Sequence, residues 1–217
     1  LTFNKKKIQA VVFDFDNTIV DGDYWIIERW KKTNIYINKK YNYKNYDKYF
    51  WQIFYEKGIF YKKHVNDTLF KLGEDLSIVN EIVAYFHKTE IDDIMIKNAL
   101  ECLHKLNKKY TLGLITNGKK EVQLRRIKKA KMIKYFKSIT YAYEFPKPSK
   151  IPFLKCIKEL NIKPKNIVYV GDDYEIDYIP ALKLGLNPIL FDQKSSKRDD
   201  SSCHTVNDLK SLMNMLC

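Results

Sequence analysis

A short apolar run near the start of the chain, Ile8–Phe15, ends among acidic residues. Its length and β-branched side chains are typical of a strand that is buried on both faces of a sheet. Asp14 and Asp16 stand at its carboxyl end, where two desolvated like charges are costly. Because alternate residues of an extended strand point the same way, we expect the two carboxylates to converge on one small volume. A divalent cation there would neutralise them, and a substrate phosphate could bridge the metal.

The remainder of the chain divides by composition. Residues 21–94 contain all three tryptophans and no proline, and they predict amphipathic helices near 23–34, 44–57, 60–73 and 77–88. From about Ile94 onward, helical and strand patterns alternate. We expect strands at 110–116, 138–143, 166–171 and 188–191, between helices at 95–108, 119–133, 150–160, 177–184 and 206–216. The polar residues 195–202 predict a loop.

This alternation predicts a parallel sheet with right-handed crossovers and helices on both faces. The first strand precedes the helical block and the other strands follow it, so the block is an insertion. We therefore predict an α/β fold with a doubly wound, Rossmann-like core, residues 1–20 and 95–217, and an inserted all-helical cap, residues 21–94. Since the cap follows the two acids directly, we expect it to cover the active face.

Two further segments follow strands and suit a phosphate group. Thr116, Asn117 and Gly118 end one expected strand and open directly into a helix. A hydroxyl, an amide and helix N-terminal N–H groups make a phosphate cradle, although an ordinary helix cap has the same composition. Lys147 stands between two prolines, in a restricted extended turn after the next strand. Its ammonium could pair with a phosphate and with Asp14, or be solvated like most lysines.

Acids cluster again where the strand at 166–171 ends. Asp172 and Asp173 follow Gly171 directly, and Asp177 lies in the next turn of chain. Asp172, at the strand terminus itself, suits a hard cation. Asp177 could instead do no more than match the charge of the following helix. The sequence thus predicts a second group of acids beside the first.

The net charge of +13 raises the possibility of a nucleic-acid partner. Basic residues concentrate at 24–63 and 119–134, and a basic face with interleaved tyrosines can bind phosphate backbone and stack bases. The chain is, however, rich in Lys, Asn, Ile and Tyr throughout, as an A+T-biased genome would give. We favour this compositional explanation and regard a nucleic-acid partner as unlikely. A basic surface would also attract a small anionic phosphate.

Compartment and membrane association follow from what the sequence does not contain. No run approaches the ~18 consecutive apolar residues of a membrane span, and no apolar signal region follows the basic N-terminal cluster. The four cysteines are far apart and form no C-x-x-C pair. They indicate reduced thiols rather than a disulfide frame or a zinc site. We expect a cytoplasmic protein whose catalysis depends on carboxylates.

Taken together, the four polar segments resemble the motifs of the haloacid dehalogenase superfamily, and in particular its subfamily I phosphatases with a helical C1 cap. Order and spacing agree over nearly the whole chain, as do the linking residues Gln123 and Tyr135-Phe136. The matching segments are Asp14-x-Asp16-x-Thr18, Thr116-Asn117-Gly118, Lys147-Pro148 and Gly171-Asp172-Asp173-x-x-x-Asp177. One departure is Pro180-Ala181, where the family usually has glycine and alanine.

The resemblance implies a mechanism for the acids. Asp14 would be the nucleophile and form an aspartyl-phosphate. Asp16 would protonate the leaving oxygen and then activate the water that hydrolyses the intermediate. The cofactor would be Mg²⁺, held by the Asp14 carboxylate, the Asp16 backbone carbonyl and Asp172.

The resemblance also implies roles for the remaining motif residues. Thr116, the N–H of Asn117 and Lys147 would hold the phosphoryl oxygens. Asp173 and Asp177 would orient the waters of the metal. The helical block would close over the site and exclude bulk water.

Several other activities deserve comparison with a phosphatase. Dehalogenases of this superfamily lack the second acid, so Asp16 argues against them, and no cap lysine is singled out for the Schiff base of a phosphonatase. A sugar phosphomutase shares both acids and stays an alternative. A basic binding module built on a decayed phosphatase would need lost motif residues, and none is lost. We expect hydrolysis of a small phosphorylated metabolite, either a sugar phosphate or a nucleoside monophosphate, whose sugar or base the cap tyrosines could stack against.

Overall fold

The computed structural model describes residues 5–59, 61–193 and 203–217. The chain forms two compact units. The core unit comprises Leu1–Gly22 and Asp93–Cys217, and the helical unit comprises Asp23–Asp92. Over the described ranges, every helix is too short or too polar to cross a lipid bilayer.

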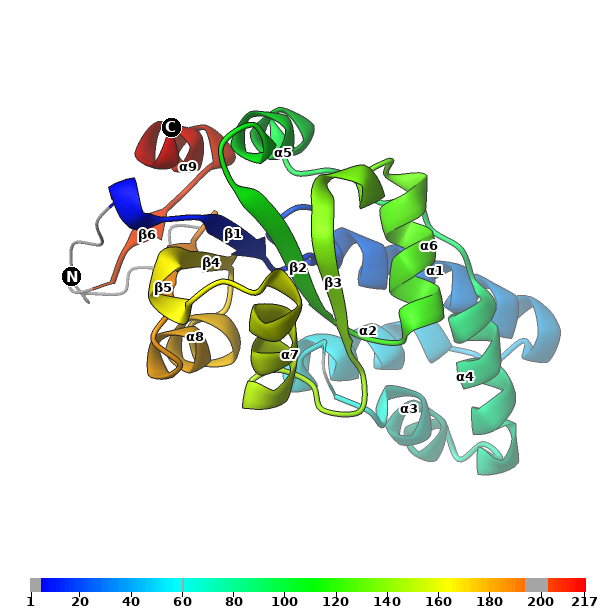
Figure 1. Ribbon diagram of the computed structural model, residues 1–217. Coiled ribbons are helices and arrows are strands. Elements are labelled where there is room, and N and C mark those ends of the chain that lie inside the picture. The colour runs from blue at the N-terminus through cyan, green and yellow to red at the C-terminus, as the bar shows by residue number, and fades with distance from the viewer. Residues whose placement is uncertain (1–4, 60, 194–202) are drawn as a thin grey trace. The chain divides into compact units, whose positions relative to one another are not determined.

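Parallel strands form the sheet of the core unit, in the spatial order β3-β2-β1-β4-β5-β6 (Figure 1). Phe13, the last residue of β1, lies opposite Leu114 of β2 and Val170 of β4. The strand bounds are β1 Ala10–Phe13, β2 Thr111–Asn117, β3 Phe136–Ala142, β4 Ile167–Gly171, β5 Asn187–Phe191 and β6 Thr205–Val206. The predicted doubly wound α/β sheet is confirmed, and the residues that follow β1, β2 and β4 emerge at one edge of it.

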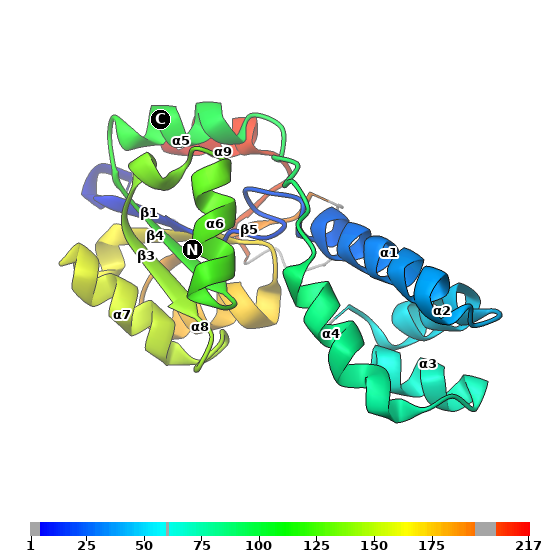
Figure 2. The same ribbon diagram turned by 90° about the vertical axis from the view of Figure 1, so that its right-hand side faces the viewer.

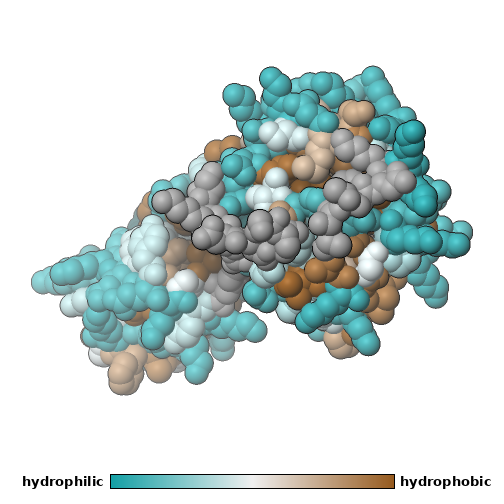
Figure 3. Space-filling model, turned by 90° about the vertical axis from the view of Figure 1, so that its left-hand side faces the viewer, coloured by the Kyte–Doolittle hydropathy of each residue, from teal (hydrophilic) through white to brown (hydrophobic). Residues whose placement is uncertain are grey.

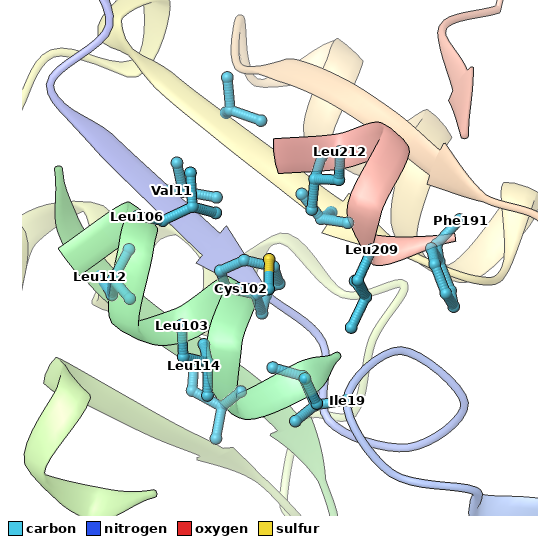
Figure 4. Close-up of a cluster of buried hydrophobic side chains, with 14 of the residues drawn as sticks. Val11, Ile19, Cys102, Leu103, Leu106, Leu112, Leu114, Phe191, Leu209 and Leu212 are labelled. Atoms are coloured by element: carbon cyan, nitrogen blue, oxygen red, sulfur yellow. The ribbon is translucent and has the colours of Figure 1, made fainter. Parts of the chain in front are cut away.

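Side chains of β1 alternate between two hydrophobic clusters. Val11 and Phe13 lie in the cluster that includes residues of α5, α6 and α9 (Figure 4). Ala10 and Val12 lie in the cluster that includes residues of α7 and α8. Figure 2 shows these helices on opposite faces of the sheet. Their bounds are α5 Ala99–Asn107, α6 Lys120–Lys129, α9 Leu209–Leu216, α7 Lys150–Leu160 and α8 Ile179–Lys183. Burial on both faces explains why β1 is apolar throughout.

Two differences from the predicted elements have clear causes. Helix α1 runs over Gly22–Tyr41 and does not end near residue 34, because the fully buried Ile37 continues its apolar face. The strand β6 is absent from the prediction because a strand of two residues carries too little pattern to recognise. The expected loop at 195–202 lies outside the described residues.

The helix expected at 177–184 is divided in the structure. A π-helical turn, Tyr174–Tyr178, precedes the five-residue helix α8. Pro180 lies in the first turn of α8, where a residue without an N–H is tolerated. Pro180, the residue that departs from the family pattern, therefore lies at the start of a helix.

Helices α1, α2 (Tyr46–Lys57), α3 (His64–Leu72) and α4 (Val79–Lys88) build the helical unit around an aromatic core. Trp30 stacks on Phe86 with ring centroids 4.1 Å apart, and Tyr46 and Phe50 are fully buried. Hydrophilic side chains predominate on the face of the molecule in Figure 3, with hydrophobic residues exposed between them.

A buried arginine ties the two ends of the helical unit together. Arg29, on α1, is 3% exposed. Its guanidinium donates to the carbonyl oxygens of Phe86 (2.8 Å), His87 (2.9 Å) and Thr89 (3.1 Å), at the end of α4. The carbonyl oxygen of Phe86 also accepts from the backbone N–H of Thr89 at 3.2 Å, and Arg29 supplies further donors to the end of α4.

We expect Arg29→Met to destabilise the helical unit by about 2–4 kcal/mol, because three carbonyl groups at the end of α4 lose the buried guanidinium that donates to them. Since all three tryptophans lie within residues 25–51, tryptophan fluorescence during urea unfolding reports this unit selectively. Lys31→Met is the matched control, because Lys31 forms an exposed pair with Glu28 on the same helix, and it should change stability by about 0.5 kcal/mol or less. Equal unfolding midpoints for the two variants would contradict the role assigned to Arg29.

Candidate active site

Three strand ends deliver the candidate residues to one edge of the sheet. Asp14 follows β1 directly, and its backbone N–H donates to the carbonyl oxygen of Val170 in β4 at 2.8 Å. Thr116 and Asn117 close β2, and Asp172 follows β4. In open parallel sheets, ligands bind outside the carboxyl ends of the strands, where the connections diverge. The register of the sheet therefore places the predicted motifs at the edge where a site is expected.

A buried lysine joins the first and fourth motifs. Lys147 is 5% exposed, and its Nζ lies 2.5 Å from Oδ1 of Asp14 and 2.7 Å from Oδ1 of Asp177. The hydroxyl of Tyr169 donates to the same Asp177 oxygen at 2.7 Å. The backbone N–H of Lys147 donates to Oδ1 of Asn117 at 2.9 Å, which fixes the turn that carries the lysine. The predicted pairing of Lys147 with Asp14 is present.

Three carboxylates gather around this lysine. Oxygen atoms of Asp14, Asp172 and Asp177 all lie within 4.8 Å of one another. Burial raises the pKa of Asp14 well above its usual range; Lys147 opposes the shift, and the neighbouring Asp177 and Asp172 add to it. Burial and the charge of Asp177 likewise raise the pKa of Asp172 to about 7.

Burial is the largest cause of both shifts, and the three carboxylates also carry more negative charge than Lys147 alone can balance. For Lys147, the attraction of Asp14 and Asp177 outweighs burial, and its pKa is raised, so it stays charged. Oxygen ligands close together with unbalanced negative charge are what Mg²⁺ requires. The carboxylates of Asp14, Asp172 and Asp177 thus fit the requirements of a divalent cation.

A glycine makes this close arrangement possible. An added Cβ on Gly171, the last residue of β4, would lie 2.5 Å from the carboxyl carbon of Asp177. Any side chain there would push the Asp177 carboxylate away from Lys147. Glycine at this position therefore allows the close approach of Asp177 to the end of β4.

Asp16 is held differently from Asp14. The strand ends at Phe13, and Asn17 turns the chain with φ +57°, a left-handed conformation that asparagine tolerates. The expectation that both acids lie on one extended strand is thus wrong. The Asp16 carboxylate pairs with Arg126, with Nη2 to Oδ1 at 2.7 Å, whereas Asp14 pairs with Lys147. Asp16 is also the less buried of the two acids.

Asp173 and Asp177, expected to share one role, make different contacts in the structure. The Asp173 carboxylate accepts from the backbone N–H groups of Glu175 (2.8 Å) and Ile176 (2.9 Å), and so caps the π-helical turn. Asp177 lies within the carboxylate group itself and is not limited to balancing the charge of a helix end.

Three residues of the site were not predicted from the sequence. Tyr169 lies in an apolar strand, where nothing distinguishes it from a core aromatic residue. Arg126 lies in the basic run of α6, which reads as solvated surface, and its partner Asp93 precedes the first core helix without a motif. The available signal was helical spacing: Arg126 lies three residues after Gln123, on the same face of the helix.

Comparison with known proteins agrees with this arrangement. A family model for haloacid dehalogenase-like hydrolases matches residues 11–191. Glyceraldehyde 3-phosphate phosphatase of Methanocaldococcus jannaschii is 25% identical over 224 residues, covering 96% of this chain and 97% of that protein. N-acylneuraminate-9-phosphatase of Mus musculus is 25% identical over 212 residues, covering 88% and 85%.

Among solved structures, the magnesium-bound HAD-hydrolase YfnB of Bacillus subtilis superposes with a TM-score of 0.74 at 18% identity. The superposition covers 96% of this chain and 98% of that chain, and shows the common fold. The family match extends from β1 through β5 and includes each of the four motifs. The chain belongs to the family of haloacid dehalogenase-like hydrolases.

Proposed function

We propose that the protein is a Mg²⁺-dependent phosphomonoester hydrolase that acts on a small phosphorylated metabolite. The observation that carries the proposal is the buried pairing of Lys147 with Asp14 at 2.5 Å, beside Asp172 and Asp177, at the carboxyl end of the central strand. The two curated relatives described above are phosphatases of small phosphorylated compounds, which supports this reaction class.

In the proposed first step, a carboxylate oxygen of Asp14 attacks phosphorus and the bond to the leaving oxygen breaks. Asp16 donates a proton to that oxygen, and Asp14 carries the phosphoryl group as an aspartyl-phosphate. In the second step, Asp16 takes a proton from water as the water oxygen attacks phosphorus. Orthophosphate leaves and the Asp14 carboxylate is regenerated.

The other residues bind and orient the phosphoryl group. The Thr116 hydroxyl, the Asn117 N–H and the Lys147 ammonium donate to its oxygens, and preorganised donors of this kind stabilise the charge that develops in the transition state. Mg²⁺, when bound by Asp14, Asp172 and the Asp16 carbonyl, supplies positive charge between the carboxylates and the phosphate. Asp177 keeps Lys147 in place, and Asp173 contributes by fixing the turn that carries Asp177.

We also propose that the two parts of the chain have different roles. Residues 1–20 and 95–217 would form the catalytic core, and residues 21–94 the cap that excludes bulk water during the reaction. The names of the two curated relatives favour a sugar phosphate or a related phosphorylated carbohydrate over a nucleoside monophosphate as the substrate class.

The test is phosphate release from a panel of sugar phosphates, nucleoside monophosphates and p-nitrophenyl phosphate, with Mg²⁺ and with EDTA. We expect release with Mg²⁺, a loss of at least about 100-fold with EDTA, since the metal supplies several kcal/mol of charge stabilisation, and recovery when Mg²⁺ is restored. The best substrate then identifies the substrate class. Release that is indifferent to EDTA would overturn the metal dependence. No release from any compound by the folded, Mg²⁺-loaded protein would overturn the phosphatase and favour a mutase.

A further inference from the structure

Arg126 connects residues that the proposed mechanism uses separately. It is 4% exposed and lies on the inner face of α6. Its Nη2 donates to Oδ1 of Asp16 at 2.7 Å, and its Nη1 donates to Oε1 of Gln123 at 2.9 Å. Its Nε and Nη2 both contact Oδ1 of Asp93, at 3.0 and 2.5 Å. Asp93 therefore fixes the guanidinium plane, and the guanidinium fixes two further side chains.

Gln123 links Arg126 to the phosphate-binding residues. Its Nε2 donates to Oγ1 of Thr116 at 2.6 Å, and also lies 3.1 Å from Oδ2 of Asp16 and from the carbonyl oxygen of Asn117. Because an amide NH₂ can only donate, the Thr116 hydroxyl must accept this bond. The hydroxyl hydrogen of Thr116 is then directed away from Gln123 and is available to a phosphoryl oxygen.

The orientation of the Gln123 amide depends on Arg126. An amide can rotate and exchange its oxygen and nitrogen, and only the hydrogen bonds of its neighbours decide between the two orientations. Arg126 Nη1 requires the oxygen on its own side. On the other side of the amide, Oδ2 of Asp16 and the carbonyl oxygen of Asn117 require the nitrogen. Without Arg126, the amide oxygen loses its donor and Gln123 is held from one side only, so its Nε2 is less firmly placed against the Thr116 hydroxyl.

We propose that Arg126, held by Asp93, is a positioning residue that orients the Asp16 carboxylate directly and the Thr116 hydroxyl through Gln123. One side chain thereby fixes the orientation of both the acid/base carboxylate and a hydroxyl that binds the phosphate. This inference rests on the proposed phosphatase function and adds a residue outside its four motifs. A purely structural arginine would affect stability, and would lower the turnover of every substrate equally.

The test compares two substrates that differ in their need for a proton. The leaving alkoxide of an alkyl phosphate must be protonated, whereas p-nitrophenolate departs readily as an anion. The measured quantity is kcat/KM, which reports steps up to the first irreversible one. We expect Arg126→Met to lower kcat/KM for the alkyl phosphate at least about 10-fold more than for p-nitrophenyl phosphate, which is a part of the 10²–10⁴-fold that acid catalysis contributes in total.

The two arms of the inference have separate readouts. We expect Gln123→Met to weaken competitive inhibition by orthophosphate by about 10-fold, as loss of one directed hydrogen bond to a charged group implies. In the Asp16→Asn background, Arg126→Met should add no further difference between the two substrates, because both substitutions remove the same function. Arg126→Lys keeps the charge but lacks the planar fork whose separate nitrogens contact Asp16, Gln123 and Asp93, and it should give intermediate losses.

The neighbouring arginine of α6 provides the control. Arg125→Met removes the adjacent, exposed arginine of α6, and should leave both substrates and phosphate inhibition unchanged. If Arg126→Met does not fold, Arg126→Lys and Gln123→Met carry the test. Equal losses for the two substrates with unchanged phosphate inhibition would overturn the positioning role. A wild-type protein that releases no phosphate from either substrate would instead overturn the proposed function, and this inference with it.

Discussion

Replacing Asp14 by Asn should abolish phosphate release, with a loss of at least about 10⁴-fold in kcat, as seen when a covalent nucleophile is removed. The Asn amide has nearly the shape of the carboxylate but is a very weak nucleophile, so no aspartyl-phosphate can form. Lys147 would keep its 2.7 Å pair with Asp177, and the fold should be retained. The measurement is steady-state phosphate release with Mg²⁺, on the best substrate of the panel.

The control for this substitution is another Asp→Asn exchange in the core unit. Asp208 caps α9 by accepting from the N–H of Ser211 at 2.7 Å, and asparagine caps a helix equally well. Asp208→Asn should therefore leave activity unchanged. If Asp14→Asn retains more than about a tenth of the wild-type rate, an effect far below that of losing a nucleophile, the covalent mechanism is wrong, and direct attack by water would replace it.

Lys147→Met should produce the second largest effect, on both activity and stability. Activity should fall by about 10²–10³-fold or more, because a donor to the phosphoryl oxygens is lost. Without Mg²⁺, the folded state should lose about 3–5 kcal/mol, since removing one partner of a buried ion pair leaves uncompensated charge. Asp14 and Asp177 would then face each other and Asp172 without their shared cation.

Calorimetric unfolding with and without Mg²⁺ measures this loss. If the proposed site binds a divalent cation in the folded state, the cation should raise the melting temperature of Lys147→Met as well as that of the wild type. Lys150→Met, a substitution of an exposed lysine at the start of α7, is the control and should change neither property. An active or fully stable Lys147→Met variant would contradict the central place that Lys147 has in this site.

The fold was accessible from the sequence because its signals are local and repeated. Apolar runs such as Val11–Phe13 alternate with helical patterns, and such alternation leaves few alternatives to a parallel sheet. The motif residues Asp14, Lys147 and Asp177 were accessible for a different reason: polar side chains at the ends of buried strands have few structural uses. The structure brings these three into direct contact.

What could not be predicted depends on long-range contacts. Nothing local shows that the strand ends at Phe13, before Asp16, or that Asp16 pairs with Arg126, 110 residues later in the chain. The basic run around Arg126 hides one buried side chain among many exposed ones. Tyr169 is likewise hidden, because its hydroxyl finds a partner only when Asp177 folds back over Gly171.

The most direct test of the account is to trap the phosphorylated enzyme. The wild-type protein with Mg²⁺ and its best substrate is quenched in acid within one turnover, digested, and analysed by mass spectrometry. The account predicts one phosphoryl group, located on Asp14, and none in Asp14→Asn treated in the same way. A phosphoryl group on any other residue, or unmodified protein throughout a turnover that releases phosphate, would contradict it.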